Sequence, residues 1–461
     1  MILNVNDTDY VRCRDAVRSR ISGKSMKAYV MTFGCQQNEA DSETIRGILT
    51  DMGYTVSSDY SECDVIILNT CAIREHAEAK VFSMLGNFKP LKQQKPWLIV
   101  GVVGCMAAES GVIERLKRNF HYVTFTLEPN MLHKLPSVID NAYPEDERSF
   151  VFGEDKGDIY EGKPTLRDGG CRAWVSVMYG CNNFCSYCIV PYVRGRERSR
   201  SSEVILNECR ELIRDGVREI TLLGQNVNSY NAEMSFPELL ESIAGLEGDF
   251  LVRFMTSHPK DASPELIEVM RRHRGKIAPS FHLPLQSGSD RILKKMNRTY
   301  DRARYLSLIK DLREAIPDIS LSTDIIVGFP GETDEDFDMT MDIIESVRFD
   351  MVYSFIYSKR EGTVAARMTD EFVPREKSAE RMKRLLDAQK EISHEKNAPY
   401  EGKCVRVLCE GIAKRGTENT YVGRTDTNKS VKFTSDSGRI GEFVTVKINR
   451  AGASDLFGEQ I

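Results

Sequence analysis

The chain has no apolar run long enough to cross a bilayer, because stretches such as 97–103 fall far short of the roughly 20 residues that a transmembrane helix needs. It also lacks a strong net charge. Its 63 Lys and Arg against 68 Asp and Glu leave −5, which argues against a uniformly basic coat but allows a local basic face. No apolar leader opens the chain at 1–7, so we expect a cytoplasmic protein with reduced thiols and no membrane contact.

What the chain has is cysteine, with twelve in 461 residues, and three of them stand in one short motif. The run 180–188 reads Gly-Cys-Asn-Asn-Phe-Cys-Ser-Tyr-Cys, a Cys-x3-Cys-x2-Cys triplet of Cys181, Cys185 and Cys188. Three thiolates can bind three irons of a [4Fe–4S] cubane and leave the fourth iron open. An open metal position is typical of a catalytic site. With the aromatic Tyr187 before its last cysteine, the motif resembles that of radical S-adenosylmethionine (SAM) enzymes.

Two other interpretations of this triplet are a zinc site and a disulfide framework. Zinc could bind the three thiolates together with a histidine, such as His258 or His282. Structural zinc sites usually bring ligands in two close pairs, however, and no second pair follows at a suitable distance. A disulfide framework is disfavoured in a chain expected to be cytosolic.

A second triplet is spread along the first third of the chain. Cys35, Cys71 and Cys105 are spaced by about the length of one βαβ unit. Each follows a strand-like run and leads into a helical pattern, which predicts a parallel sheet with all three thiols at its carboxyl edge. There they would face helix N-termini, which lower thiolate pKa values. We interpret them as ligands of a second cluster; three inert buried cysteines are the alternative, and the other six cysteines are assigned to packing or surface.

The middle of the chain alternates strands with helical segments. This alternation predicts a parallel sheet with right-handed crossovers, two units short of an eight-stranded barrel. The six predicted strands are 172–179, 218–223, 251–255, 279–285, 319–327 and 351–357. Radical SAM enzymes are known for such an open six-unit barrel, which this segment resembles in length and order.

Barrel chemistry lies on the loops that follow the strands, and these loops are rich in glycine, hydroxyls and amides. By resemblance to the superfamily, SAM would bind the open iron and lie along them. The residues expected to contact SAM are Tyr187, Gly224, Gln225, Ser257, Gln286, Ser287, Asp324 and Gly328. His258, which precedes a proline, is interpreted as a loop anchor rather than a proton-transfer group.

The end of the chain changes to short alternating strands. Five strands within about sixty residues predict a small closed β-barrel. The run 423–428 and the strand 429–433 resemble the TRAM domain of RNA-modifying enzymes. A basic strip at 194–200 follows the cysteine motif, and two roles are open for it: contact with tRNA phosphates or contact with the cluster itself. The residues expected to contact RNA are Arg194, Arg196, Arg198, Arg424, Lys429 and Lys432.

This order of domains resembles the radical SAM methylthiotransferase family. The runs 69–75 (Asn-Thr-Cys-Ala-Ile-Arg-Glu) and 190–197 (Val-Pro-Tyr-Val-Arg-Gly-Arg-Glu) are similar to its branch named MiaB. The implied α/β architecture is an extension at 1–25, an open parallel α/β domain with the auxiliary cluster at 26–142, a (βα)6 radical SAM core at 167–397 and a TRAM barrel at 400–461.

The resemblance implies an enzyme that methylthiolates C2 of N6-dimethylallyladenosine at position 37 of tRNA. Two [4Fe–4S] clusters and two SAM molecules per turnover are implied. Cys181, Cys185 and Cys188 would hold the cluster that cleaves SAM to a radical, and the second triplet would hold the cluster that donates sulfur. Unpaired anticodon-loop bases can be splayed into a pocket.

The implied partners are the tRNA anticodon stem-loop and a reducing donor such as flavodoxin or ferredoxin, with the chain as a monomer. Two related substrates remain as alternatives: N6-threonylcarbamoyladenosine in tRNA and an aspartate of a ribosomal protein. From other classes of protein, a non-catalytic iron–sulfur carrier and a zinc-containing RNA-binding protein remain.

Overall fold

The computed structural model describes residues 2–7, 9–72, 75–143, 148–153, 157–167, 169–414 and 419–461. The chain forms two compact units. The first unit comprises Met1–Asp168, Met178–Asn182 and Cys188–Arg200, and the second comprises Gly169–Val177, Asn183–Tyr187 and Ser201–Ile461. The loop that carries the Cys181–Cys188 motif therefore contributes to both. Among the described residues, no helix is long and apolar enough to cross a membrane.

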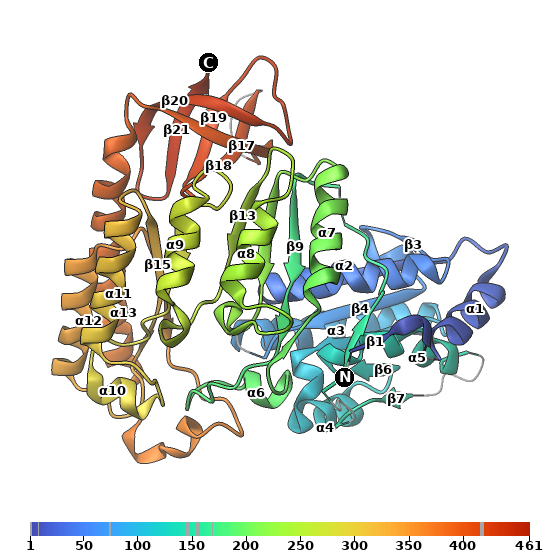
Figure 1. Ribbon diagram of the computed structural model, residues 1–461. Helices are drawn as coiled ribbons and strands as arrows, with labels where there is room; N and C mark the ends of the chain where they lie inside the picture. The colour runs from blue at the N-terminus through green and yellow to red at the C-terminus, as the bar shows by residue number, and fades with distance from the viewer. Residues whose placement is uncertain are drawn as a thin grey trace. The chain divides into compact units, whose positions relative to one another are not determined.

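The first unit is built on a parallel sheet of six strands in the order β3-β2-β4-β5-β6-β7. Every residue of β4 and β5 is buried, as expected of β-branched strands with helices on both faces (Figure 1). The strands are β2 (Lys27–Thr32), β3 (Thr55–Val56), β4 (Val65–Thr70), β5 (Ile99–Gly104), β6 (Phe125–Leu127) and β7 (Ser149–Phe150). The helices are α1 (Tyr10–Ile21), α2 (Gln36–Asp51), α3 (Glu75–Gln94), α4 (Ser110–Asn119) and α5 (Leu135–Asn141). A separate pair, β1 (Ile2–Asn4) and β8 (Ile159–Glu161), is also parallel.

The helix expected after Cys105 is present as α4 but begins later than expected. Cys105 opens a single 3-10 turn, Cys105–Ala108, and not an α-helix, because the extended backbone of Glu109 separates that turn from α4. Cys35 does occupy the position directly before α2. Ile73 and Arg74, part of the motif after Cys71, lie outside the described residues.

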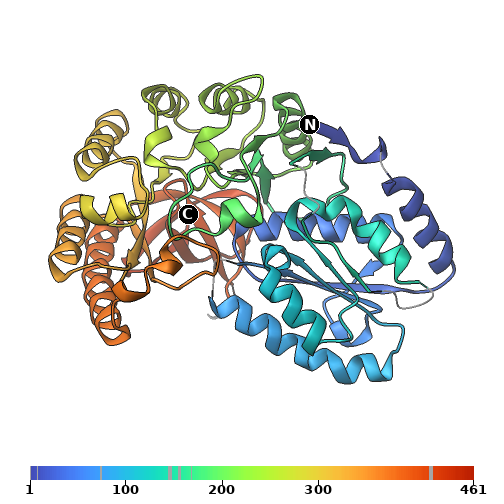
Figure 2. The ribbon, with the colours of Figure 1, turned by 90° about the horizontal axis from the view of Figure 1, so that it is seen from below.

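The second unit contains the six predicted barrel strands as two parallel three-stranded sheets, β13-β12-β9 and β14-β15-β16. An isolated bridge, Val252 to Ile277, joins the first sheet to the segment before β14. The helices lie outside the strands (Figure 2). The strands are β9 (Arg172–Ser176), β12 (Glu219–Leu223), β13 (Leu251–Phe254), β14 (Ser280–His282), β15 (Ser320–Val327) and β16 (Met351–Ile356). The helices are α7 (Ser202–Arg214), α8 (Phe236–Ala244), α9 (Pro264–Arg272), α10 (Asp290–Lys295), α11 (Arg302–Ala315), α12 (Asp334–Val347) and α13 (Arg375–Asn397).

Two of these strands are markedly shorter than expected, and the other four differ from their predicted ranges by one residue. The predicted strand 172–179 ends at Ser176, and Met178–Tyr179 becomes β10, which pairs antiparallel with β11 (Arg198–Ser199) in the first unit. Of the predicted strand 279–285 only β14 forms, because Pro284 has no N–H that could donate a hydrogen bond to a neighbouring strand.

The chain ends in a closed five-stranded barrel with the strand order β17-β18-β19-β21-β20, here called the tail barrel. Its core includes Val407, Phe433 and Ile448, each of which is fully or almost fully buried. The strands are β17 (Cys404–Ile412), β18 (Thr420–Thr425), β19 (Ser430–Thr434), β20 (Phe443–Ala451) and β21 (Asp455–Gln460). The expected α/β fold with a small terminal β-barrel is therefore confirmed.

The tail barrel lies at the amino-terminal ends of the barrel strands (Figure 1), where hydrogen bonds and the Lys429–Asp350 ion pair hold it. Arg253 donates to the Thr425 carbonyl at 2.9 Å and to Glu219 at 2.7 Å. Arg172 binds the same carboxylate at 2.8 Å, and Lys429 binds Asp350 at 2.7 Å. The carboxyl ends of the strands, where barrel enzymes hold their ligands, are therefore at the opposite end from the tail barrel.

Replacing Glu219 by Gln should destabilise the second unit by about 3–5 kcal/mol, because two guanidiniums would lose their buried counter-charge. Burial opposes the Glu219 charge, but Arg253 and Arg172 outweigh it and lower the carboxyl pKa. The stabilisation is therefore complete above the ordinary glutamate pKa and is lost as the pH falls through the lowered value. Thermal unfolding against pH measures both effects. Glu268→Gln, in the exposed pair with Arg271, is the control and should leave the melting temperature unchanged.

Candidate active site

Three cysteines lie at one edge of the sheet in the first unit. Cys35 follows β2, Cys71 follows β4 and Cys105 follows β5, and these three strands are neighbours in the sheet. The loops approach each other closely, since a Cβ added at Gly34 would lie 2.8 Å from the Cys71 Cβ. Gly104, at φ +92°, makes the turn into Cys105. The predicted convergence at the carboxyl edge thus agrees with the strand order.

A buried amide network holds these loops in register. Asn38, fully buried on α2, accepts from the Cys35 N–H at 3.3 Å and donates to the Thr70 carbonyl at 3.1 Å. Asn69 donates to the Asn38 carbonyl at 2.8 Å and to Ser42 at 2.9 Å. Because Asn38, Ser42, Asn69 and Thr70 are fully buried, losing a partner would cost a desolvation penalty. The amides therefore fix the spacing between the Cys35 and Cys71 loops.

The sulfur of Cys105 lies beside a buried arginine from the segment that follows the Cys181–Cys188 motif. Nε of Arg194 is 3.3 Å from the Cys105 Sγ, and its Nη2 is 2.8 Å from Asp41 of α2. Burial raises the pKa of Cys105 to about 12 despite Arg194, so the expectation that a helix N-terminus lowers it does not hold at this cysteine. Only a strong cationic ligand would keep this sulfur as a thiolate.

The donor set fits a cubane cluster better than a single ion. Thiolates on three loops at one sheet edge, with a buried guanidinium donating toward one sulfur, suit a soft anionic cluster. Each thiolate of a cubane binds a different iron, so the three sulfurs need not converge on one point. Across the described ranges, no group of three or more His, Cys, Asp or Glu is arranged to hold a single metal ion.

The first half of the Gly180–Cys188 loop is fastened within the first unit. The N–H of Cys181 donates to the Gly195 carbonyl at 3.1 Å, and Asn182 N–H donates to Glu197 at 3.0 Å. Gly180 has φ +75°, and a Cβ there would lie 2.0 Å from the Arg196 carbonyl oxygen. Only glycine therefore allows the loop to pack against the following basic segment.

The second half of this loop is fastened within the second unit. Asn297 donates to the Phe184 carbonyl at 3.0 Å, and Phe184 itself has φ 47°. Arg298 Nη1 is 3.2 Å from the Cys185 Sγ. Tyr187 packs edge-on against Phe329, with ring centroids 6.5 Å apart. Tyr187 therefore supports the loop by packing, and Arg298 is a site residue that sequence reasoning missed.

The residues expected to bind SAM lie where expected, after successive barrel strands. Gly224 and Gln225 follow β12, Ser257 follows β13, and Gly328 follows β15. Gln286 and Ser287 come after β14, and Gln286 N–H donates to the Asp324 carbonyl at 2.8 Å.

Several polar atoms in these loops fit a bound polar ligand. The side-chain oxygens of Gln225 and Asn226 and the Asn228 amide nitrogen are buried without a hydrogen-bond partner among the described residues. Thr256 and Gln286 have φ near +70°, a strained conformation for residues with a Cβ. Unpaired buried groups and strained backbone are both typical of a ligand site. The loops thus fit SAM.

The two histidines weighed as zinc ligands have other partners. His258 Nδ1 accepts from the Lys260 N–H at 3.2 Å, and its ring lies edge-on to Tyr300. Burial, with Arg298 and Lys260 nearby, lowers the pKa of His258 to about 2, so it is neutral near pH 7 and anchors the loop. His282 forms a 3.0 Å hydrogen bond with Ser322.

Asp324 lies on the more accessible face of β15, where alternate residues are partly exposed and those between them are buried. It pairs in register with Tyr353 of β16, and its carboxylate is 3.6 Å from the His282 ring nitrogen. Tyr353 and Phe355 expose large side chains on the same face. Asp324 is therefore accessible to a ligand.

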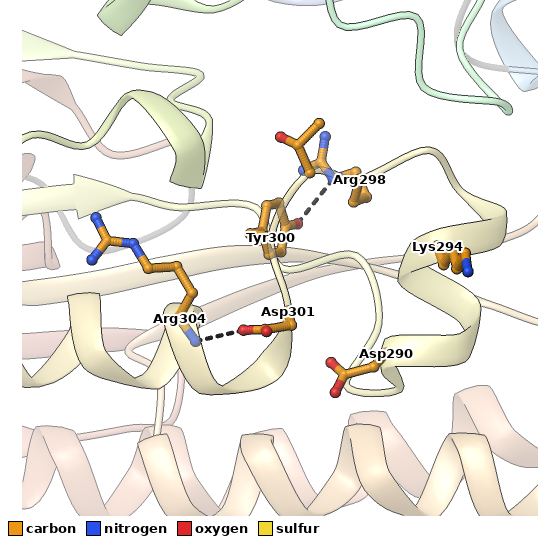
Figure 3. A pocket seen from close by; sticks show the side chains of 7 residues that line it. Asp290, Lys294, Arg298, Tyr300, Asp301 and Arg304 are labelled. Atoms are coloured by element: carbon orange, nitrogen blue, oxygen red, sulfur yellow. Dashed lines mark hydrogen bonds between the residues drawn. The ribbon is translucent and has the colours of Figure 1, made fainter.

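A pocket of about 460 Å³ opens beside Arg298 (Figure 3). Arg298 donates to the Tyr300 hydroxyl at 2.9 Å, and Asp301 caps α11 through the Arg304 N–H. Its lining residues are Asp290, Lys294, Arg298, Thr299, Tyr300, Asp301 and Arg304. The pocket thus flanks the arginine that contacts Cys185.

The residues expected to contact RNA divide into buried and accessible ones. Arg194 and Lys429 are 3% and 9% exposed, and each is paired with a carboxylate whose side chain is 10% exposed, so neither presents its charge to a phosphate. Arg196 is exposed. Arg424 and Lys432 are part-exposed but paired with Glu410 and Asp455, and Arg198 donates to the Arg194 carbonyl.

Family models match all three parts of the chain. Residues 27–128 match the uncharacterized protein family UPF0004, residues 175–344 the radical SAM superfamily and residues 399–461 the TRAM domain. Together with the cysteine motif and the SAM loops, these matches define a radical SAM enzyme with a TRAM domain.

Curated relatives specify the family. The chain is 48% identical to the tRNA-2-methylthio-N(6)-dimethylallyladenosine synthase of Acetivibrio thermocellus, over 95% of the chain and 91% of that protein. It is 47% identical to the enzyme of the same name from Carboxydothermus hydrogenoformans, over 93% and 98%. The chain belongs to the tRNA-2-methylthio-N(6)-dimethylallyladenosine synthase family. The resemblance stated from the sequence is thereby confirmed.

Solved structures support the fold alone. The radical SAM methyltransferase TsrM from Kitasatospora setae, with tryptophan and a SAM analogue bound, aligns with a TM-score of 0.54 at 13% identity, covering 74% of this chain and 75% of that chain. The cobalamin-dependent radical SAM enzyme OxsB aligns at 0.51 and 11% identity, covering 82% and 62%.

Proposed function

We propose that the chain adds a methylthio group to C2 of N6-dimethylallyladenosine at position 37 of tRNA. The observation that carries this proposal is the near-full-length similarity to relatives named for that product. The bound groups, SAM and two [4Fe–4S] clusters, would supply the radical and the sulfur.

The two cysteine triplets have different roles in this reaction. Cys181, Cys185 and Cys188 hold the cluster that binds SAM, and the loops at Gly224, Gln286 and Gly328 hold the rest of that ligand. Cys35, Cys71 and Cys105 hold the auxiliary cluster. In support, these cysteines end adjacent strands of one sheet, and the SAM loops carry unpaired buried polar atoms.

The remaining assignments follow from this chemistry. The tRNA would be held through Arg196 and through Arg424 and Lys432 of the tail barrel, with a flavodoxin or ferredoxin as electron donor. The enzyme acts as a cytoplasmic monomer. The functional segments are the extension 1–25, the auxiliary-cluster domain 26–142, the radical SAM core 167–397 and the TRAM domain 400–461.

Purified enzyme should modify tRNA that carries N6-dimethylallyladenosine and leave tRNA that carries N6-threonylcarbamoyladenosine unchanged, because its relatives are named for the first base. Mass analysis of the tRNA nucleosides measures the gain of one methylthio group. A gain only on the threonylcarbamoyl base would contradict the proposal.

Cys181→Ala should abolish SAM cleavage, since two remaining thiolates hold the SAM-binding cluster poorly. The measurement is 5′-deoxyadenosine formed per enzyme under reducing conditions. Cys404→Ala is the control, because this exposed cysteine belongs to the tail barrel. Undiminished 5′-deoxyadenosine from Cys181→Ala would refute the assignment of the triplet.

Cys71→Ala should retain SAM cleavage while the methylthio product disappears, because the variant lacks only a ligand of the proposed sulfur donor. Iron content should fall by about one cluster. Cys63→Ala, another buried cysteine of the same unit, is the control for packing effects. Normal methylthio product from Cys71→Ala would show that the second triplet is not the donor site.

A further inference from the structure

We propose that Arg194 is a positioning residue of the Cys35–Cys71–Cys105 site, whose guanidinium donates a hydrogen bond to the Cys105 sulfur and raises the reduction potential of the cluster held there. The inference rests on the proposed function, because it takes these three cysteines as ligands of the auxiliary cluster. It goes further by assigning a role to a residue that is not itself a ligand.

Arg194 is brought to this sulfur by the packing of its own segment. The short helix α6 (Val190–Val193) precedes it, and Ile189 and Val193 form one buried apolar cluster with Ala72 and Cys105. The Arg194 N–H continues the turn by donating to the Val190 carbonyl at 2.8 Å. Packing of this apolar cluster therefore positions the Arg194 guanidinium next to the Cys105 sulfur.

The guanidinium is held at several points. Nη2 donates to Asp41 at 2.8 Å while Nε points to the Cys105 Sγ at 3.3 Å. Asp41 also accepts from Gln37 at 3.1 Å, which orients the carboxylate. The Arg194 carbonyl accepts from Asn130 and from Arg198. A planar guanidinium that is bound to a carboxylate through one nitrogen can direct another N–H toward a fixed acceptor. The single ammonium group of a lysine cannot do this.

This geometry predicts an effect on redox chemistry beyond folding. A donor to a cluster sulfur withdraws electron density from the iron and favours the reduced state, and hydrogen bonds to the sulfurs are among the factors that set cluster potentials. The low dielectric of a buried site strengthens the effect. Asp41 balances the charge of Arg194, so the influence on Cys105 is that of a directed hydrogen bond.

The test isolates the auxiliary cluster in the full-length chain. The variant Cys181→Ala/Cys185→Ala/Cys188→Ala removes the other cluster, and the protein is reconstituted with iron and sulfide and titrated by electron paramagnetic resonance. Adding Arg194→Gln should shift the midpoint potential to a more negative value with iron content unchanged. Arg194→Lys should restore the potential only in part. Arg118→Gln, at an exposed position of α4 in the same unit, should not shift the potential.

The outcomes separate this inference from the proposed function. A cluster whose potential is the same with Arg194 and with Gln would overturn the inference alone. If the triple variant binds no cluster, the proposed function of the second triplet fails together with the inference.

If Arg194→Gln does not fold, the inference can still be tested on protein that retains Arg194. With ¹⁵N-labelled arginine, pulsed electron paramagnetic resonance of the reduced auxiliary cluster should detect a weakly coupled nitrogen. Absence of that coupling would overturn the inference, because a purely structural Arg194 would not donate to the cluster sulfur.

Discussion

The structure around both cysteine triplets depends on one constraint: a buried cysteine sulfur must stay ionised and fixed in position without water to solvate its charge. Burial raises the pKa of Cys105 to about 12 even with Arg194 beside it, so its thiolate requires further compensation from its surroundings. The chain supplies a guanidinium to one sulfur of each triplet, Arg194 to Cys105 and Arg298 to Cys185. Each arginine is held at its other atoms by a second partner, and these contacts constrain the loops around both triplets.

Site residues that are marked by their neighbours along the chain could be predicted from the sequence. The Cys181–Cys188 motif is contiguous, and Cys35, Cys71 and Cys105 are marked by strand-like runs that end just before them. The helix after Cys105 begins later than predicted because Glu109 takes an extended conformation, a feature that composition does not reveal. Strand limits shifted for similar local reasons, as at Pro284 beyond β14.

Residues whose roles depend on tertiary contacts could not be predicted. Asn38 and Asp41 look like ordinary polar positions of a helix, yet both are buried and face the cysteine loops. Arg194 and Lys429 belong to basic stretches that favour RNA binding by composition, but the fold uses their charges internally. An arginine in a basic strip and an arginine beside a thiolate have the same sequence signature, and only burial distinguishes them.

The two guanidiniums differ in what balances them, and this difference has a chemical consequence. Arg194 forms an ion pair with Asp41, so the pair brings a directed donor but little net charge to Cys105. Arg298 is bound by the Tyr300 hydroxyl and the Pro284 carbonyl, which are neutral, so it retains its positive charge beside Cys185. Because a net charge acts over a longer range than a hydrogen bond, Arg298 contributes more positive potential at Cys185 than the Arg194–Asp41 pair contributes at Cys105. The same residue type therefore gives the two triplets different electrostatic environments, in keeping with the different chemistry proposed for each.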